Sequence, residues 1–306
     1  MRGVRPVQDS ASPSLPLPQA RWTVRLDLLP VLSLSLLAAG CATISVPENQ
    51  FFHPGHAALP ANARAMAASA GLQIEDVWFR GADSTRLHGL FVRTPGARNT
   101  MLYFGGDNFR LATGGAPAAL LLRSLGVNGL LVEYRGYGES EGTPTLPLVK
   151  DDALRAYDYL AARPDVDRSR IVVHGLSLGS FMAPYVAEQR GAGVLVLEAS
   201  ATSARGWAKD RTPWYRKPFV RVRMSPAMSA EDNVARLRRY RGPLLLVVGA
   251  NDPVTRPEMS RRLYRASATP PARKRLVVAA GKTHGDAMAS PETIAAYRAF
   301  LAEMLP

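Results

Sequence analysis

Short apolar runs alternate with segments of helical periodicity along most of the chain from about residue 71 onwards. The apolar runs are rich in valine, isoleucine and leucine, a pattern typical of strands buried on both faces of a parallel sheet. They predict strands at 100–104, 129–133, 171–173, 193–197, 244–248 and 274–278. Apolar positions at helical spacing predict helices at 110–125, 146–162, 179 to about 189, 256–266 and 291–304.

A hairpin is predicted before these elements, because residues 74–80 and 86–93 alternate in β fashion around the turn at 81–84. Strands that alternate with helices at this spacing imply a mostly parallel central sheet with helices on both faces. The antiparallel hairpin then belongs at the N-terminal edge of the sheet. The expected fold class is α/β, with the folded domain at 71–306.

The stretch from Arg170 to Phe181 joins a predicted strand to a predicted helix through Gly175-Leu176-Ser177-Leu178-Gly179. This is the G-x-S-x-G pattern of a nucleophile elbow. A serine on so tight a turn needs unusual backbone torsions, and glycines two residues to either side remove side chains that would collide. We expect the Ser177 hydroxyl to point outward above a helix N-terminus. The same five positions also occur by chance in simple turns.

A serine nucleophile needs a base, and the base needs a carboxylate that orients it. Asp252 follows the strand at 244–248, and His284 follows the strand at 274–278. The order Ser, acid, His and the location of each residue at the C-terminal end of a strand predict a triad of Ser177, Asp252 and His284. Each residue also has a simpler interpretation, because an aspartate before proline often forms a turn and a lone histidine in a turn is usually solvated.

Other residues fit the roles of base and acid less well. His174 lies beside the elbow, but its place on the strand points it away, so a core histidine is expected there. Asp286 could orient His284 only through a local contact. The remaining histidines precede the serine and lack the expected order: His53, His56 and His88.

An oxyanion hole requires two backbone N–H groups near the attacked carbonyl. We expect one at Leu178, directly after the serine, and the other at Asp107 in the turn Gly105-Gly106-Asp107. A carboxylate beside a developing oxyanion is unfavourable, so the Asp107 side chain is expected to face elsewhere, toward an arginine. Neither a metal nor an organic cofactor is expected.

Together these motifs resemble the α/β-hydrolase superfamily, and more narrowly its compact branch of serine-aminopeptidase-like and acyl-protein-thioesterase-like hydrolases. The resemblance covers roughly residues 74–305. Besides the elbow and the loops of the predicted acid and base, it rests on the run 133–140, Glu-Tyr-Arg-Gly-Tyr-Gly-Glu-Ser. It implies an α/β-hydrolase fold and a hydrolytic reaction. One departure is Gly105-Gly106, where the branch usually has His-Gly. Glu198 resembles part of a family loop, for which a structural role is expected.

The first 41 residues have the composition of a secretory signal, with arginines, then an apolar run at 26–39, then small residues before Cys41. This ending resembles a bacterial lipobox. We therefore expect Cys41 to be lipidated and to anchor the protein in the cell envelope, outside the cytoplasm. Residues 42–70 would be a tether in which prolines discourage regular structure. The alternative is a plain signal-anchor with an inert cysteine.

The formal net charge is +13, and only five of the 38 basic residues are lysines. A nucleic-acid-binding surface needs such charge gathered into a patch with interleaved aromatic residues. Only residues 216–223 and 236–241 are locally dense in arginine and lysine. We expect no nucleic-acid partner, but some attraction to anionic membranes.

Room for a cap lies at residues 200–240. This stretch forms either a small helical lid with an acyl-facing wall or a basic surface excursion, and it contains Trp207, Trp214, Tyr215 and Phe219. The function predicted from the whole sequence is hydrolysis of a carboxylic ester or thioester, with a small-molecule or acylated substrate.

Two other functions remain open from the sequence. The first is a serine aminopeptidase on the same triad, for which Glu198 or Asp107 could supply an anionic subsite for the substrate amine. The second is a non-catalytic binding protein of the cell envelope that keeps the fold.

Overall fold

The structure is a computed structural model and describes residues 42–212, 214–215 and 217–306. The predicted signal peptide at 1–41, with Cys41, lies outside the described residues, so its lipidation stays a prediction. In the described chain no helix is both long enough and apolar enough to cross a membrane.

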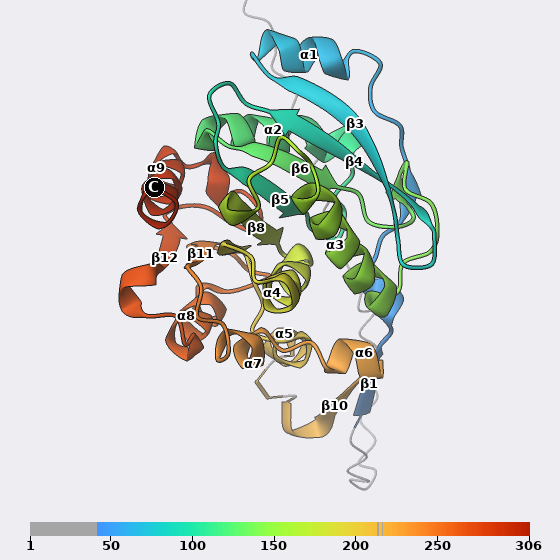
Figure 1. Cartoon of the computed structure of the whole chain (residues 1–306). Coiled ribbons are helices and arrows are strands. Elements are labelled where there is room, and N and C mark those ends of the chain that lie inside the picture. Colours follow the sequence, from blue (N-terminus) through green and yellow to red (C-terminus); the bar gives the residue numbers. More distant parts are fainter. Residues whose placement is uncertain (1–41, 213, 216) are drawn as a thin grey trace, which may run out of the picture. The chain divides into compact units, whose positions relative to one another are not determined.

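An eight-stranded sheet forms the centre of the described chain (Figure 1). The strand order is β12-β11-β9-β8-β5-β6-β4-β3, and every neighbouring pair is parallel except the two pairs that involve β4. The strands are β3 (Gln73–Arg80), β4 (Arg86–Arg93), β5 (Thr100–Phe104), β6 (Asn128–Val132), β8 (Ile171–Leu176), β9 (Val194–Glu198), β11 (Leu244–Gly249) and β12 (Lys274–Ala279).

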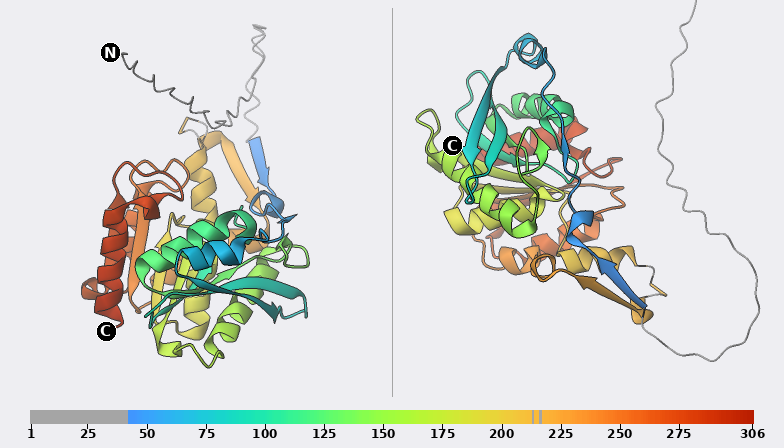
Figure 2. Two further views of the ribbon diagram at one scale, coloured as in Figure 1. Left: turned by 90° about the horizontal axis from the view of Figure 1, so that it is seen from above. Right: turned by 90° about the vertical axis from the view of Figure 1, so that its right-hand side faces the viewer.

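Helices cover both faces of this sheet (Figure 2). One face carries α3 (Leu146–Ala161), α4 (Gly179–Arg190) and α8 (Pro257–Ala266), and the other carries α2 (Leu111–Leu125) and α9 (Pro291–Met304). Each face has its own apolar cluster, to which alternate residues of a strand contribute. Because the strands are buried on both sides, their sequences are continuous apolar runs. Each buried leucine or valine side chain stabilises the fold by roughly 1.5–3 kcal/mol.

The predicted fold class is confirmed, and the hairpin of β3 and β4 lies at one edge of the sheet as predicted. Strand and helix bounds agree with the predicted ones within a few residues. Helix α9 begins after Ser290, whose hydroxyl accepts a hydrogen bond from the Thr293 N–H, with Pro291 in the first turn.

Residues 42–70 differ from the expected tether, because they contain regular structure. They form β1 (Ala42–Val46), a short β2 (Gly55–His56) and α1 (Ala63–Ser69). The prolines of this segment lie between its strands and helix and so do not interrupt them. The buried Phe52 side chain packs into the cluster under α3 and α4, which fixes the segment against the domain.

Strand β1 pairs in parallel with β10 (Val220–Met224), from the stretch at 200–240, and Figure 2 shows the two side by side. The 200–240 stretch also contains α5 (Ala204–Arg211), α6 (Pro226–Ser229) and α7 (Asn233–Leu237). The sequence did not predict this pairing, because the two partners are almost 180 residues apart. Trp214 and Phe219 of the stretch are exposed, at 81% and 60%.

Candidate active site

The turn between β8 and α4 holds Ser177 in a left-handed backbone conformation, with φ of +53°. A Cβ atom on Gly175 would lie 2.2 Å from the carbonyl oxygen of Gly179, and a Cβ on Gly179 would lie 2.1 Å from that of Phe104. Both positions therefore require glycine. The structure has the strained turn that the G-x-S-x-G pattern predicts.

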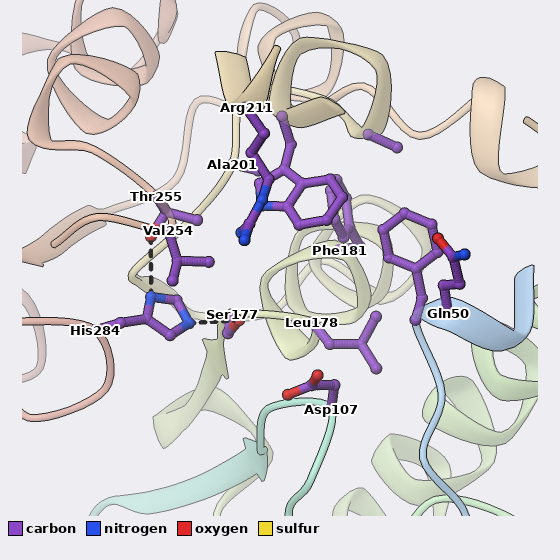
Figure 3. Close-up of a pocket in the computed structure, with 13 residues that line it drawn as sticks. Gln50, Asp107, Ser177, Leu178, Phe181, Ala201, Arg211, Val254, Thr255 and His284 are labelled. Carbon is purple, nitrogen blue, oxygen red and sulfur yellow. Dashed lines mark hydrogen bonds between the residues drawn. The ribbon is translucent and has the colours of Figure 1, made fainter. Parts of the chain in front are cut away.

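The structure brings Ser177, His284 and Asp252 together at the C-terminal ends of β8, β12 and β11. The Ser177 Oγ lies 2.9 Å from the His284 Nε2, and the His284 Nδ1 lies 2.9 Å from the Asp252 Oδ2. Figure 3 shows the His284 ring beside the serine hydroxyl. The ring thus connects the hydroxyl to the carboxylate, and this is the geometry in which an imidazole takes a proton from a serine.

Asp252 is buried and accepts hydrogen bonds from the backbone N–H groups of Val254 and Thr255 and from the Thr255 hydroxyl, the last at 2.7 Å. Burial raises the pKa of this carboxyl, but the hydrogen bonds from His284 and Thr255 outweigh burial and hold the pKa below its usual value. The group is therefore a carboxylate at neutral pH and can orient the imidazole.

Thr255 is a residue that the sequence reading missed. Its hydroxyl donates to Asp252 and lies 3.3 Å from the His284 Nδ1. The signal was present in Asp252-Pro253-Val254-Thr255, because an aspartate often accepts from N–H groups two and three residues later.

Leu178 and Asp107 both line the pocket beside the serine, and their backbone N–H groups have no acceptor among the described residues. Leu178 directly follows the serine, and the Gly179 N–H donates to the Gly105 oxygen at 3.1 Å, which holds the glycine turn against the elbow. A Cβ on Gly106 would lie 3.7 Å from the Ser177 Cβ, so the turn lies close beside the serine. Unpaired N–H groups in these positions are suited to bind a developing oxyanion.

The Asp107 side chain was expected to face an arginine, but in the structure it lies beside His53. Its Oδ2 lies 3.3 Å from the His53 Nδ1, and both side chains are about half exposed. The nearby Arg110 instead donates to the backbone oxygens of His53 and Gly55. The guanidinium is thus engaged by carbonyl groups, and the carboxylate of Asp107 lines the pocket beside the serine.

The other residues weighed from the sequence do not join this arrangement. His174 is buried and bonds to Glu198, with its Nε2 3.1 Å from the Glu198 Oε2. The backbone oxygen of Glu198 accepts from the Ser177 N–H at 3.0 Å, so the residue supports the elbow from below. Asp286 accepts from the Thr283 N–H. In the described part of the chain, no three His, Cys, Asp or Glu side chains gather as a metal site would require.

A cavity of about 390 Å³ opens above the serine (Figure 3). Its walls come from α4, from the 200–240 stretch and from the N-terminal segment that the sequence predicted as a tether. Most of the lining is apolar, and the lining side chains outside the triad loops are Gln50, Phe51, Asp107, Leu178, Phe181, Ala201, Ala204, Trp207 and Arg211. Phe51 packs against Trp207 with ring centroids 5.3 Å apart, which joins the two distant segments.

Comparisons with known proteins indicate the family and the fold. Residues 149–305 match the model of the prolyl oligopeptidase family. The chain is 30% identical over 266 residues to an uncharacterized protein of Mycobacterium tuberculosis strain CDC 1551, covering 86% of this chain and 90% of that protein. It is also 30% identical to the α/β-hydrolase domain-containing protein WAV2 of Arabidopsis thaliana, covering 66% of this chain and 69% of that protein.

Among solved structures, the esterase Pf2001 of Pyrococcus furiosus superposes with a TM-score of 0.62 at 20% identity, covering 83% of this chain and all of that one. At this identity the likeness shows the fold. The superfamily predicted from the motifs is confirmed, whereas the narrower branch stays a prediction. The chain belongs to the α/β-hydrolase superfamily and, within it, to the prolyl oligopeptidase family.

Proposed function

We propose that this serine hydrolase cleaves a carboxylic ester or thioester through a covalent acyl-enzyme. The observation that carries the proposal is the pair of 2.9 Å hydrogen bonds linking the Ser177 Oγ, the His284 ring and the Asp252 carboxylate. The largely apolar cavity beside Ser177 suits the hydrocarbon part of an acyl group.

In the first half of the reaction, the Ser177 Oγ attacks the carbonyl carbon while the His284 Nε2 takes the hydroxyl proton. Asp252 accepts from the Nδ1–H, which fixes the tautomer and stabilises the imidazolium that forms. The N–H groups of Leu178 and Asp107 donate to the oxyanion. The C–O or C–S bond then breaks, and His284 gives its proton to the departing alcohol or thiol.

In the second half, a water molecule gives a proton to the His284 Nε2 and attacks the carbonyl carbon of the acyl-enzyme. The second tetrahedral intermediate collapses, the bond from the carbon to the Ser177 Oγ breaks, and the serine recovers its proton from the imidazolium. The products are the carboxylic acid and the free enzyme.

The test is turnover of 4-nitrophenyl butyrate together with labelling by a fluorophosphonate. Ser177→Ala is expected to lower kcat by roughly a millionfold and to abolish labelling, because it removes the nucleophile. The matched control is Ser69→Ala on the exposed face of α1, which should leave both readouts unchanged. Retained turnover or labelling in Ser177→Ala would overturn the proposal, and a wild-type protein that never labels would favour the non-catalytic envelope binding protein.

A peptidase is the second candidate, and two observations favour it. The family that the chain matches is named for an oligopeptidase, and the Asp107 carboxylate lines the pocket, where it could bind a substrate amine. Glu198 does not line this cavity, since it is buried beneath the elbow. Rates for an aminoacyl 4-nitroanilide and for 4-nitrophenyl butyrate separate the two functions. Faster cleavage of the anilide, lost in Asp107→Asn, would favour the peptidase.

We also propose that the protein is anchored in the cell envelope by lipid at Cys41. The apolar run that ends in small residues before this cysteine supports the proposal. Cys41→Ser is expected to move the protein from the membrane fraction to the soluble fraction of fractionated cells. Unchanged retention of this variant on membranes washed with high salt, which removes electrostatic binding, would contradict lipidation and favour a signal-anchor.

A further inference from the structure

The candidate pocket carries a guanidinium that the proposed reaction does not use. Arg211, at the C-terminal end of α5, lines the same cavity as Ser177 and His284. Its guanidinium carbon lies 4.9 Å from the centre of the Trp207 ring, and Figure 3 shows the side chain reaching from α5 into the cavity. A cation–π contact of this kind does not use the guanidinium N–H groups, which stay available to donate to a ligand.

Within the described part of the chain, Arg211 has neither a carboxylate partner nor a hydrogen-bond acceptor. The neighbouring Arg256 differs, because it donates to the backbone oxygen of Asp210 and lies 3.6 Å from the carboxylate of that residue. Asp107, an acidic residue that lines the same cavity, lies beside His53. The cavity is apolar over most of its wall and has two charged lining side chains, the carboxylate of Asp107 beside His53 and the guanidinium of Arg211, which has no acidic partner among the described residues.

The location of Arg211 indicates which part of a substrate it meets. A departing alcohol or thiol must take its proton from the His284 Nε2, so the leaving group occupies the His284 side of the cavity. Arg211 borders a second hollow with Pro253 and Val254, on the loop that carries Asp252. In Figure 3, Phe181 and Gln50 lie on the other side of the serine. The Arg211 guanidinium and the apolar Phe181 side chain thus lie on different sides of the serine.

We propose that Arg211 binds an anionic group, a carboxylate or phosphate, on the leaving alcohol or thiol of the substrate. The inference rests on the proposed function and narrows its substrate class to acyl esters or thioesters with an anionic leaving group. A guanidinium donates two parallel hydrogen bonds to a carboxylate or phosphate, and the apolar walls screen this interaction less than open water does.

A pair of substrates of equal shape tests the proposal, 4-(butanoyloxy)benzoate and 4-(butanoyloxy)benzamide. They share the butanoyl group and the phenol ring, and the para substituent of the leaving group is an anionic carboxylate in one and a neutral amide of similar shape in the other. The wild-type enzyme is expected to favour the benzoate in kcat/KM, after correction for the rates of alkaline hydrolysis. In Arg211→Gln the ratio of the two values should fall about tenfold, because a charge-assisted hydrogen bond is lost at a partly exposed site. The effect should shrink with added salt.

Arg205→Gln is the matched control, because it removes the same charge from the same helix at an exposed position that does not line the cavity. It should leave the ratio unchanged. Arg211→Lys keeps the charge but not the flat fork, and an intermediate ratio is expected. The analogue 4-(butanoyloxy)phenylphosphonate, with a phosphonate in place of the carboxylate, distinguishes the two anions.

Three outcomes would overturn the inference. The first is a wild-type ratio near one, and the second is an equal drop in Arg205→Gln. The third is a preference, dependent on Arg211, for mono-4-nitrophenyl succinate over 4-nitrophenyl butyrate, which would put the anion on the acyl side. If Ser177→Ala loses all turnover but the wild-type enzyme shows a benzoate-to-benzamide ratio near one, the proposed function stands and only this inference fails. The two failures are therefore distinguishable.

Discussion

At the scale of single residues, the run 133–140 that marks the family resemblance has a structural role. Arg135 is almost fully buried and donates to Asp152 through Nε and a terminal nitrogen, both at 2.6 Å, and to Asp83 at 2.8 Å. Burial, together with the charges of Asp83 and Asp151, raises the pKa of Asp152 although the Arg135 guanidinium opposes it, whereas the hydrogen bond from Arg135 holds the pKa of Asp83 well below its usual value. Removing the guanidinium would leave a buried carboxylate unpaired, which is strongly destabilising.

Glu133 of the same run accepts from the N–H of Leu111, in the first turn of α2, and from the N–H of Glu139. Its Oε2 also lies 2.9 Å from the Nδ1 of the buried His88. Burial lowers the pKa of His88, but the hydrogen bonds and charges of Glu133, Asp76 and Glu139 outweigh it and raise the pKa above 6.5. The imidazolium is therefore favoured in the folded state.

The raised pKa of His88 makes the free energy of unfolding depend on pH. Its folded-state pKa is above the unfolded one, so its contribution is complete below pH 6.5 and is lost as the pH rises through the folded-state pKa. The unfolding free energy, measured in urea at about pH 6 and about pH 9, should fall more in the wild type than in His88→Gln. Equal losses in the two proteins would contradict a raised pKa.

Asp252 carries the second prediction at this scale. Asp252→Asn keeps the shape of the side chain but favours the wrong tautomer of His284, so kcat for 4-nitrophenyl butyrate should fall roughly 10⁴-fold, as in other Ser-His-Asp enzymes. Circular dichroism should show an unchanged fold. Asp286→Asn is the matched control, because the Asp286 carboxylate accepts, among the described residues, from the Thr283 N–H of its own loop. A larger loss in Asp286→Asn than in Asp252→Asn would reassign the acid.

At the scale of elements, the elbow depends on the close approach of β5, β8 and α4. Gly179→Ala places a methyl group 2.1 Å from the Phe104 oxygen and should destabilise the protein by about 2–3 kcal/mol. Gly106→Ala meets only the Ser177 Cβ at 3.7 Å and should cost less than about 1 kcal/mol. Urea unfolding of both variants checks the contrast. Equal destabilisation would show that the clash at Gly179 is relieved by a backbone shift.

The elements that the sequence predicted well are those whose pattern is local. An apolar run predicts strand β8, and a Ser-Pro start predicts helix α9. Ser177, Asp252 and His284 could be predicted as a set because each follows such a locally recognisable strand. The pairing of β1 with β10 depends on a contact between distant segments that no local pattern encodes. The orientation of Asp107 toward His53 has the same cause, since His53 belongs to a segment predicted as unstructured.

At the scale of the whole molecule, the N-terminal segment connects the candidate site to the proposed anchor. Cys41 directly precedes β1, and β1 pairs with β10 of the 200–240 stretch. Phe51, a few residues later, lines the cavity and packs on Trp207 of α5. In a protein held by lipid at Cys41, the pocket-wall residue Phe51 would thus follow the anchored cysteine by ten positions along the chain.

The last prediction concerns the surface near β1 and β10, where Trp214, Phe219 and Ile44 are exposed and Arg221 and Arg223 lie on β10. Aromatic side chains insert at the edge of a bilayer, and each basic residue near an anionic surface contributes about 1 kcal/mol. The Cys41→Ser protein should therefore bind vesicles that contain phosphatidylglycerol, more weakly at high salt. Replacing both arginines by glutamine should weaken binding by roughly tenfold or more.

The matched control for this double variant replaces Arg123 and Arg298, which are exposed on α2 and α9, by glutamine. Both doubles lower the net charge of +13 by the same amount, so an effect of overall charge alone would weaken vesicle binding equally in the two. A larger loss in the Arg221 and Arg223 variant, deepened by Trp214→Ala, is expected if this surface contacts the lipid. Equal losses would assign the attraction to the net charge and leave Cys41 as the sole determinant of orientation at the membrane.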